Sequence, residues 1–267
     1  MITVTPLKDL GHFKNDWLEA RYHFSFADYR DPARMGWGTL RVWNDDAIQP
    51  GGLFPPHPHR DMEIITYIRR GAITHEDNLG NRGVTKAGNV QVMSAGTGIQ
   101  HSEANLEDGV TTMFQIWIVP AEKNFQPRWE TREFPDSTVA GKLYTLASGR
   151  AKNDGGLPIH QDAAVLGATL KAGEEAVHGL PGGRRAYLVP ARGEIEVNGI
   201  AAPERAGIRV AGEETITIKA VTATEIVLVD IALVKCRTHQ SLFQGFPDPW
   251  PPPDRNTSSS PLSSAIP

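Results

Sequence analysis

The chain has 267 residues, 40% of them hydrophobic and 22% charged, with a formal net charge of −4 and a pI near 6.1. These values are typical of a soluble globular protein large enough for one large domain or two of ordinary size. No basic run or long apolar stretch stands out, so we expect no direct nucleic-acid binding and no transmembrane helix. The single cysteine, Cys236, excludes an intramolecular disulfide, and the first residues do not resemble a signal peptide. We therefore expect a cytoplasmic protein.

Short runs of alternating or β-branched residues, separated by glycine and proline, recur along the chain. Each run is typical of a strand, and their regular spacing predicts an all-β fold of barrels or sandwiches. In chain order the runs cover residues 39–43, 63–68, 90–93, 112–119, 142–146, 164–170, 186–189, 194–197, 215–218 and 225–231. The best helical pattern, over residues 13–20, predicts only a few turns of helix.

Two halves of the chain echo one another. Residues 66–71, which lead to a strand starting at Gly88, resemble residues 186–193, which lead to a strand starting at Gly207. The offset of about 120 residues is the size of a small domain and indicates duplication. A polar, turn-rich stretch near residue 125 suits the connection between the two copies.

These observations divide the chain into three parts. We predict an N-terminal domain over residues 1–125 and a C-terminal domain over residues 126–234. Residues 235–267 are rich in proline and serine and contain few apolar residues, so we expect most of this tail to be disordered.

Two pairs of residues that can bind a metal stand out in the sequence. His57 and His59 stand two residues apart where an apolar run begins, and His101 and Glu103 have the same spacing in the motif SAGTGIQHSEAN. Residues i and i+2 of a strand point to the same face, so the two pairs can converge on one point. Three imidazoles and a carboxylate suit one divalent transition metal per chain: Fe(II), Mn, Ni, Cu, Co or Zn. Nothing equivalent occurs in the second half, where His178 stands alone.

The same stretches resemble the two cupin motifs. His57-Pro-His59 followed by Glu63 and Gly71 is similar to the first motif, and the segment from Gly88 to Asn105 is similar to the second. Over residues 36–118 the resemblance is specifically to the pirin family, and looser similarity extends to about residue 233. The short second half is most similar to the bacterial pirin-like quercetin 2,3-dioxygenases. The resemblance implies two tandem cupin barrels, a bicupin, with one metal site in the first.

The resemblance also implies a role for each polar residue of the motifs. His57, His59, His101 and Glu103 are the expected metal ligands, and Glu103 is also the expected catalytic base. Glu63, which is the carboxylate ligand of ordinary cupins, is expected to hydrogen-bond near the ligands, with direct ligation as the minor alternative. His75 either supports a ligand in the same way or is a polar residue at the end of a turn.

The function that the resemblance implies is a metal-dependent dioxygenase, with Fe(II) as the first expectation for the metal. Such an enzyme opens the flavonol ring of quercetin with O2 and releases carbon monoxide. The alternative is a non-enzymatic, iron-binding pirin that acts as a redox-sensitive regulator through protein partners, and a third reading is cupin chemistry on another small molecule. Apolar residues that could line a flavonoid pocket, with ordinary core packing as the alternative, are Phe54, Met93, Phe114 and Ile116.

Overall fold

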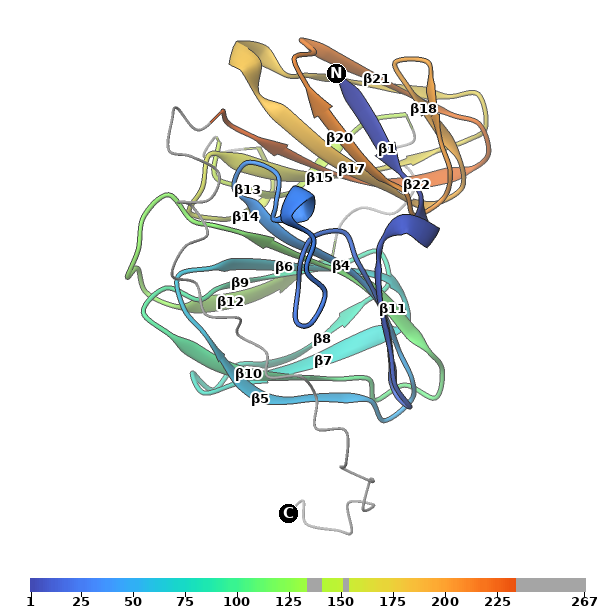
Figure 1. Cartoon of the computed structure of the whole chain (residues 1–267). Coiled ribbons are helices and arrows are strands. Elements are labelled where there is room, and N and C mark those ends of the chain that lie inside the picture. The colour runs from blue at the N-terminus through green and yellow to red at the C-terminus, as the bar shows by residue number, and fades with distance from the viewer. Residues whose placement is uncertain (134–140, 151–153, 234–267) are drawn as a thin grey trace.

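The computed structural model describes residues 1–133, 141–150 and 154–233. Within them the chain is nearly all β, which confirms the predicted fold class, and the strands form two stacked barrels (Figure 1). The helical elements that it describes are three short 3-10 turns: η1 (Leu7–Asp9), η2 (Pro32–Arg34) and η4 (Pro181–Gly183). None of the described helices is long and apolar enough to cross a membrane. The predicted tail, residues 235–267, lies outside the described residues.

The first barrel consists of two facing sheets. Its seven-stranded sheet has the order β12 (Arg128–Arg132), β9 (Val90–Ser94), β6 (Glu63–Arg70), β11 (Thr111–Ile118), β4 (Leu40–Ile48), β3 (Leu18–Tyr22) and β2 (Gly11–Lys14). Its four-stranded sheet has the order β5 (Leu53–His59), β10 (Ile99–Ala104), β7 (Ala72–Asp77) and β8 (Arg82–Lys86).

The second barrel repeats this arrangement. Its seven-stranded sheet has the order β1 (Ile2–Thr5), β20 (Gly207–Ala211), β17 (Arg185–Arg192), β22 (Thr224–Ile231), β15 (Ala163–Leu170), β13 (Tyr144–Ser148) and β14 (Leu157–Pro158). Its four-stranded sheet has the order β16 (Glu175–Gly179), β21 (Thr215–Ala220), β18 (Ile195–Val197) and β19 (Ile200–Ala202). The series β9-β6-β11-β4 thus corresponds to β20-β17-β22-β15, which confirms the duplication that the sequence echo indicated.

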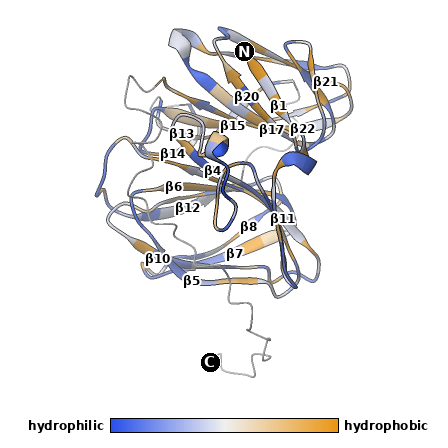
Figure 2. Cartoon of the chain, in the orientation of Figure 1, coloured by the Kyte–Doolittle hydropathy of each residue, from blue (hydrophilic) through white to orange (hydrophobic). Residues whose placement is uncertain are grey.

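Hydrophobic residues fill three layers. One cluster fills the first barrel, another fills the second, and a third lies between the two seven-stranded sheets. Figure 2 shows hydrophobic residues along the strands of both barrels and hydrophilic residues in several of the connecting loops. Each seven-stranded sheet is therefore covered on both faces, and successive residues of its central strands alternate between a barrel interior and the layer between the barrels.

Strand pairing crosses the predicted boundary at residue 125 in two places. β1, at the N-terminus, pairs with β20 of the second barrel, and β12, which follows residue 125, pairs with β9 of the first. Each barrel thus takes an edge strand from the other side of the predicted division.

The predicted helix over residues 13–20 is wrong. This segment forms the hairpin of β2 and β3, whose turn is closed by Asn15, because its side-chain oxygen accepts hydrogen bonds from the backbone N–H groups of Trp17 and Leu18. Along β3 the side chains of Leu18, Ala20 and Tyr22 are buried, which is the two-residue period of a strand.

Candidate metal centre

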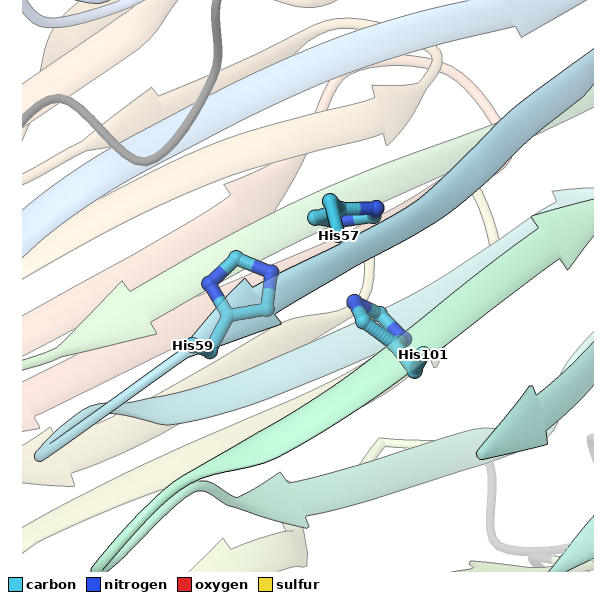
Figure 3. A group of neighbouring side chains, drawn as sticks. All are labelled: His57, His59 and His101. Atoms are coloured by element: carbon cyan, nitrogen blue, oxygen red, sulfur yellow. The ribbon is translucent and has the colours of Figure 1, made fainter. Parts of the chain in front are cut away.

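Three histidines come together on the inner face of the first four-stranded sheet (Figure 3). His57 and His59 lie on β5, and His101 lies directly opposite His57 on β10. The ring centroid of His57 is 4.8 Å from that of His59 and 4.4 Å from that of His101, and the other two are 5.0 Å apart. Candidate ligand nitrogens of all three lie within 4.8 Å of one another. The i, i+2 spacing and the strand register together produce this convergence.

The local sequence of β5 suits its position and fixes one ring. Pro55, Pro56 and Pro58 lack a backbone N–H, and β5 is an edge strand, where proline is tolerated. Nδ1 of His57 donates a hydrogen bond of 2.8 Å to the carbonyl oxygen of Pro55. The neutral ring then carries its proton on Nδ1, so Nε2 keeps the lone pair that a metal ligand needs.

The turn before β10 requires glycine. Gly96 has φ +45°, and a Cβ at this position would lie 2.0 Å from the carbonyl oxygen of Phe125. The same carbonyl accepts a hydrogen bond of 2.9 Å from the backbone N–H of Thr97. The glycine of the motif thus lets the turn pack closely against the chain before β12, and it fixes where β10 begins.

A hydrogen-bond chain orients the third histidine. Nε2 of His75 lies 2.9 Å from Oδ2 of Asp77, and Nδ1 of His75 lies 3.3 Å from Nδ1 of His101. Because the carboxylate accepts from Nε2, Nδ1 of His75 accepts from Nδ1 of His101 and leaves Nε2 of His101 deprotonated. The ring of His75 also stacks on Trp129 at 4.7 Å.

Burial keeps the three imidazoles neutral. Burial lowers the pKa of His59 to about 3 and that of His101 well below its usual range, with neighbouring histidines contributing in both cases. Burial also lowers the pKa of His57. A neutral imidazole is the form that binds a metal.

Glu103 lies beside His101, outside the cluster that His57, His59 and His101 form. Its carboxylate groups with His75 and His101, within 4.8 Å of both, in a second cluster that shares His101 with the first. The register of β10 with β5 shifts by one residue between His101 and Glu103, so that His101 lies opposite His57 and Glu103 lies opposite Phe54. Its oxygens accept hydrogen bonds of 2.6 Å from Gln91 and 2.8 Å from Gln115. Burial raises the pKa of Glu103 to about 7, although these hydrogen bonds favour the charged form.

The residues fit a divalent transition metal. Three neutral nitrogen donors and a neighbouring carboxylate form a donor set that first-row divalent ions bind. Nε2 of His101 is buried, and the part of the chain that the structure describes offers it no hydrogen-bond partner. A metal would use this lone pair and would balance the buried charge of Glu103.

Glu63 lies away from the three histidines. The chain leaves the four-stranded sheet at Arg60 and Asp61, where φ of Asp61 is +48°, so Glu63 begins a strand of the other sheet. Its carboxylate accepts hydrogen bonds of 2.6 Å from Ser94 and 3.0 Å from His160, on the side that faces the second barrel. The hydrogen bonds of Glu63 are thus made to Ser94 and His160 and not to the three histidines, because the chain changes sheets between His59 and Glu63.

A cavity of about 240 Å³ opens beside His57 and His59. Of the four residues predicted for its wall, Phe54 lines it. Met93 packs in the core of the first barrel, and Phe114 and Ile116 pack in the layer between the barrels. Alternation along β11 turns these two away from the cavity.

The residues that line the cavity are mostly aromatic or polar. They are His12, Phe13, Leu18, Tyr22, Phe26, Ala27, Asp28, Tyr29, Asn44, Asp46, Phe54, His57, His59, Gln115 and Trp117. The pyrrole N–H of Trp117 donates to the side-chain oxygen of Gln115, and the ring lies edge-on to His59 with centroids 5.0 Å apart.

Several residues around the centre were absent from the sequence prediction. Gln91 and Gln115 hold Glu103, and Asp77 holds His75. Both glutamines interrupt otherwise apolar strand runs, and a polar residue at an inward position of such a run needs a partner inside the barrel. That signal was available in the sequence.

Comparison with known proteins identifies the fold and the family. Family models described as Pirin and as the quercetinase C-terminal cupin domain match residues 4–118 and 145–231. A pirin-like protein of Caulobacter vibrioides is 55% identical over 232 residues, covering 87% of this chain and all of that protein. A quercetin 2,3-dioxygenase of Escherichia coli is 39% identical over 232 residues, covering 86% of this chain and 99% of that protein.

A solved structure agrees with these matches. The bacterial pirin YhhW of Escherichia coli, in complex with nickel(II), aligns with a TM-score of 0.82 at 38% identity, covering 88% of this chain and all of that one. Two cupin domains in one chain define a bicupin. The chain belongs to the pirin family, as its sequence motifs indicated.

Proposed function

We propose that this protein is a metal-dependent dioxygenase that opens the flavonol ring of quercetin-like substrates with O2. The observation that carries the proposal is the position of His57 and His59, which belong both to the histidine cluster and to the wall of a cavity with aromatic sides. A metal held there is accessible to a ligand in the cavity. The name of the Escherichia coli relative, quercetin 2,3-dioxygenase, supports the same activity.

Each residue has a role in this proposal. His57, His59 and His101 would hold the metal through their unprotonated nitrogens, and Glu103, which lies beside His101, would be the carboxylate ligand. His75 orients His101 through the hydrogen bond between their Nδ1 atoms. The bound metal supplies Lewis acidity and an open coordination position for a substrate oxygen.

Glu103 is the proposed base. Its carboxylate accepts the proton of the flavonol hydroxyl, and the amide groups of Gln91 and Gln115 keep it in place. A carboxylate whose pKa is raised toward neutrality is a stronger base than one in water. The aromatic wall excludes water and holds the planar substrate against the ligands.

The metal is Fe(II) in this proposal. Nitrogen and oxygen donors bind several divalent ions, and metal supply decides among them. The nickel in the structure of the Escherichia coli pirin is consistent with a donor set of this kind. Ni, Mn, Co, Cu and Zn are therefore included in the test.

The test is turnover of quercetin by protein loaded with one metal per chain. Under air, the flavonol absorbance should disappear, and carbon monoxide should be released in an equal amount. Under anaerobic conditions neither change should occur, because O2 is a substrate.

The control is His101→Ala, which should not turn over quercetin at any metal loading. A fully metallated protein that leaves quercetin untouched with every ion would contradict the proposal. Capture of a protein partner only in the iron-loaded form, without turnover, would favour the regulatory alternative.

A further inference from the structure

A row of polar side chains crosses the floor of the first barrel. Neighbouring positions in the strand register pair Tyr22 with Asn44, Asn44 with Gln115, Gln115 with Thr66, and Thr66 with Gln91. These five residues form one rung across β3, β4, β11, β6 and β9, and they share the face that points into the barrel. The adjacent rung on one side is apolar and consists of Val42, Trp117, Ile64 and Met93.

One half of this polar rung is fully used inside the protein. Gln91 and Gln115 donate to the two carboxylate oxygens of Glu103. The side-chain oxygen of Gln115 accepts from Trp117, and that of Gln91 accepts from Thr85. The role of this half of the rung is to hold Glu103, a candidate metal ligand, in place.

The other half of the rung faces the cavity. Asn44 is only 3% exposed and lines the cavity, and its Oδ1 is buried with no hydrogen-bond partner among the described residues. Leaving a buried amide unpaired is costly, so such a group indicates a missing partner. The neighbouring amide of Gln115 donates to Glu103 and accepts from Trp117.

Asp46 stands beside Asn44 on the same face of β4. It is also 3% exposed and lines the same cavity. Burial raises the pKa of Asp46 well above its usual range, and the negative charges of Asp45 and Glu103 act in the same direction. This environment favours the protonated carboxyl group, which can donate a hydrogen bond as well as accept one.

We propose that Asn44 and Asp46 form a subsite that hydrogen-bonds a phenolic hydroxyl of the substrate, while another oxygen of the same molecule lies at the histidines. This inference rests on the proposed function and narrows its substrate class. The preferred substrate is a flavonol with further hydroxyl groups on its rings, and 3-hydroxyflavone, which has only one, lacks the group that this subsite binds. The aromatic residues Phe13, Phe26 and Phe54 enclose the planar rings between the two ends.

The test measures binding, so that it does not depend on turnover. Quercetin and 3-hydroxyflavone are titrated into metal-loaded protein under anaerobic conditions, with tryptophan fluorescence as the signal. The wild type should bind quercetin at least about tenfold more tightly than 3-hydroxyflavone, the effect of one or two hydrogen bonds. Asn44→Leu should abolish this preference by weakening quercetin about tenfold and leaving 3-hydroxyflavone nearly unchanged.

A matched control lies on the same rung. Gln115→Leu also removes an amide from the cavity wall, but this amide holds Glu103, so both flavonols should weaken equally along with metal affinity. Metal content of the Asn44→Leu protein should remain at the wild-type level. If that variant does not fold, Asp46→Leu and the conservative Asp46→Asn carry the same comparison, and only the first should lose the preference.

The outcomes separate this inference from the proposed function. A preference for quercetin that survives in both Asn44→Leu and Asp46→Leu, or a wild type without any preference, overturns the subsite while quercetin turnover can still stand. Equal weakening of both ligands by Asn44→Leu also overturns it. A wild type that binds neither flavonol removes the subsite and the proposed function together.

Discussion

The two barrels each contain a buried carboxylate, and they treat it in opposite ways. Glu103 in the first barrel is 1% exposed and accepts hydrogen bonds from the neutral amides of Gln91 and Gln115. Asp230 in the second is fully buried and accepts hydrogen bonds from two cations, Arg150 and Arg184. A buried charge needs a compensating charge. The second barrel supplies it from its own side chains, whereas the first has a place for a cation from outside.

The pKa shifts express the same difference. Burial raises the pKa of Glu103 to about 7. Burial also disfavours the charged form of Asp230, but hydrogen bonds from His178 and Arg184, and the charges of Arg184 and Arg150, outweigh it and lower its pKa. The charged form of Asp230 is therefore stabilised by its own neighbours in the folded protein.

The strands that carry the histidines differ between the barrels as well. β16 and β21 occupy the places of β5 and β10 in the sheet order. On them, Ala176, Ile216 and Ile218 belong to the hydrophobic core, and His178 bonds to Asp230 at 2.9 Å. The duplicated scaffold is thus compatible with a metal centre in one copy and with an aliphatic core in the other.

The largest expected effect comes from removing the histidine that the two ligand clusters of the first barrel share. His101 belongs to both clusters, so His101→Ala should lower metal affinity about a thousandfold, roughly one ligand's share of the binding free energy of a four-ligand site. Metal per chain, measured by elemental analysis after dialysis, should fall from about one to nearly none. His178→Ala is the matched control and should retain its metal. Equal loss in both variants would contradict the assignment of the site to the first barrel.

In the second barrel, removing the buried carboxylate should lower the free energy of unfolding. Asp230→Asn leaves the cations of Arg150 and Arg184 without their partner and should lower the free energy of unfolding by about 3 kcal/mol. The measurement is urea denaturation of the metal-free protein.

Arg184 provides the control for this variant, since it also pairs with Asp162, whose side chain is 57% exposed. Asp162→Asn should cost less than about 1 kcal/mol, because an exposed pair is screened by water. Similar losses in the two variants would show that burial does not distinguish these carboxylates.

Much of the scaffold could be predicted from the sequence, because alternating hydrophobic patterns and the turn residues that flank them identify a strand from its local sequence alone. The convergence of His57, His59 and His101 followed from the spacing of the motifs and from pairing of neighbouring strands. The segment of β2 and β3 was misread as a helix, since its strands are short and the deciding signal is one side chain, Asn15, that closes the turn.

The details of the cavity could not be predicted, for a physical reason. β11 is buried on both faces, so its pattern does not tell which face meets the first barrel. Phe114 and Ile116 proved to face the second barrel, while Gln115 and Trp117 face the cavity. The position of Glu63 depended on where the chain changes sheets, which is a tertiary property that strand periodicity does not contain.

The uncompensated carboxylate of the first barrel should give the metal-free protein a distinctive pH dependence. The pKa of Glu103 is raised from 4.5 to about 7, so the folded state retains a proton that the unfolded chain loses. This contribution to stability is fully present below pH 4.5 and is lost as the pH rises through 7. Between pH 5 and pH 8 the wild type should lose roughly 2.5 kcal/mol relative to Glu103→Gln.

The comparison with Glu103→Gln isolates this effect. The buried histidines, with lowered pKa values, act in the opposite direction and stabilise the fold as the pH rises, but both proteins share them. Unfolding free energies of the two metal-free proteins at both pH values provide the measurement. A difference that does not change with pH would mean that Glu103 is not held as an uncompensated buried acid.

The smallest expected effect concerns the hydrogen-bond chain behind His101. His75→Phe keeps a ring for stacking on Trp129 but cannot accept the proton of Nδ1 of His101, so metal affinity should fall about 10- to 100-fold. His160→Phe is the matched control, because His160 stacks on Phe125 and bonds to Glu63 outside the cluster. Competition with a chelator of known affinity measures both. If the two variants bind metal equally well, the Asp77–His75 pair does not orient His101, and the first barrel relies on its three histidines and Glu103 alone.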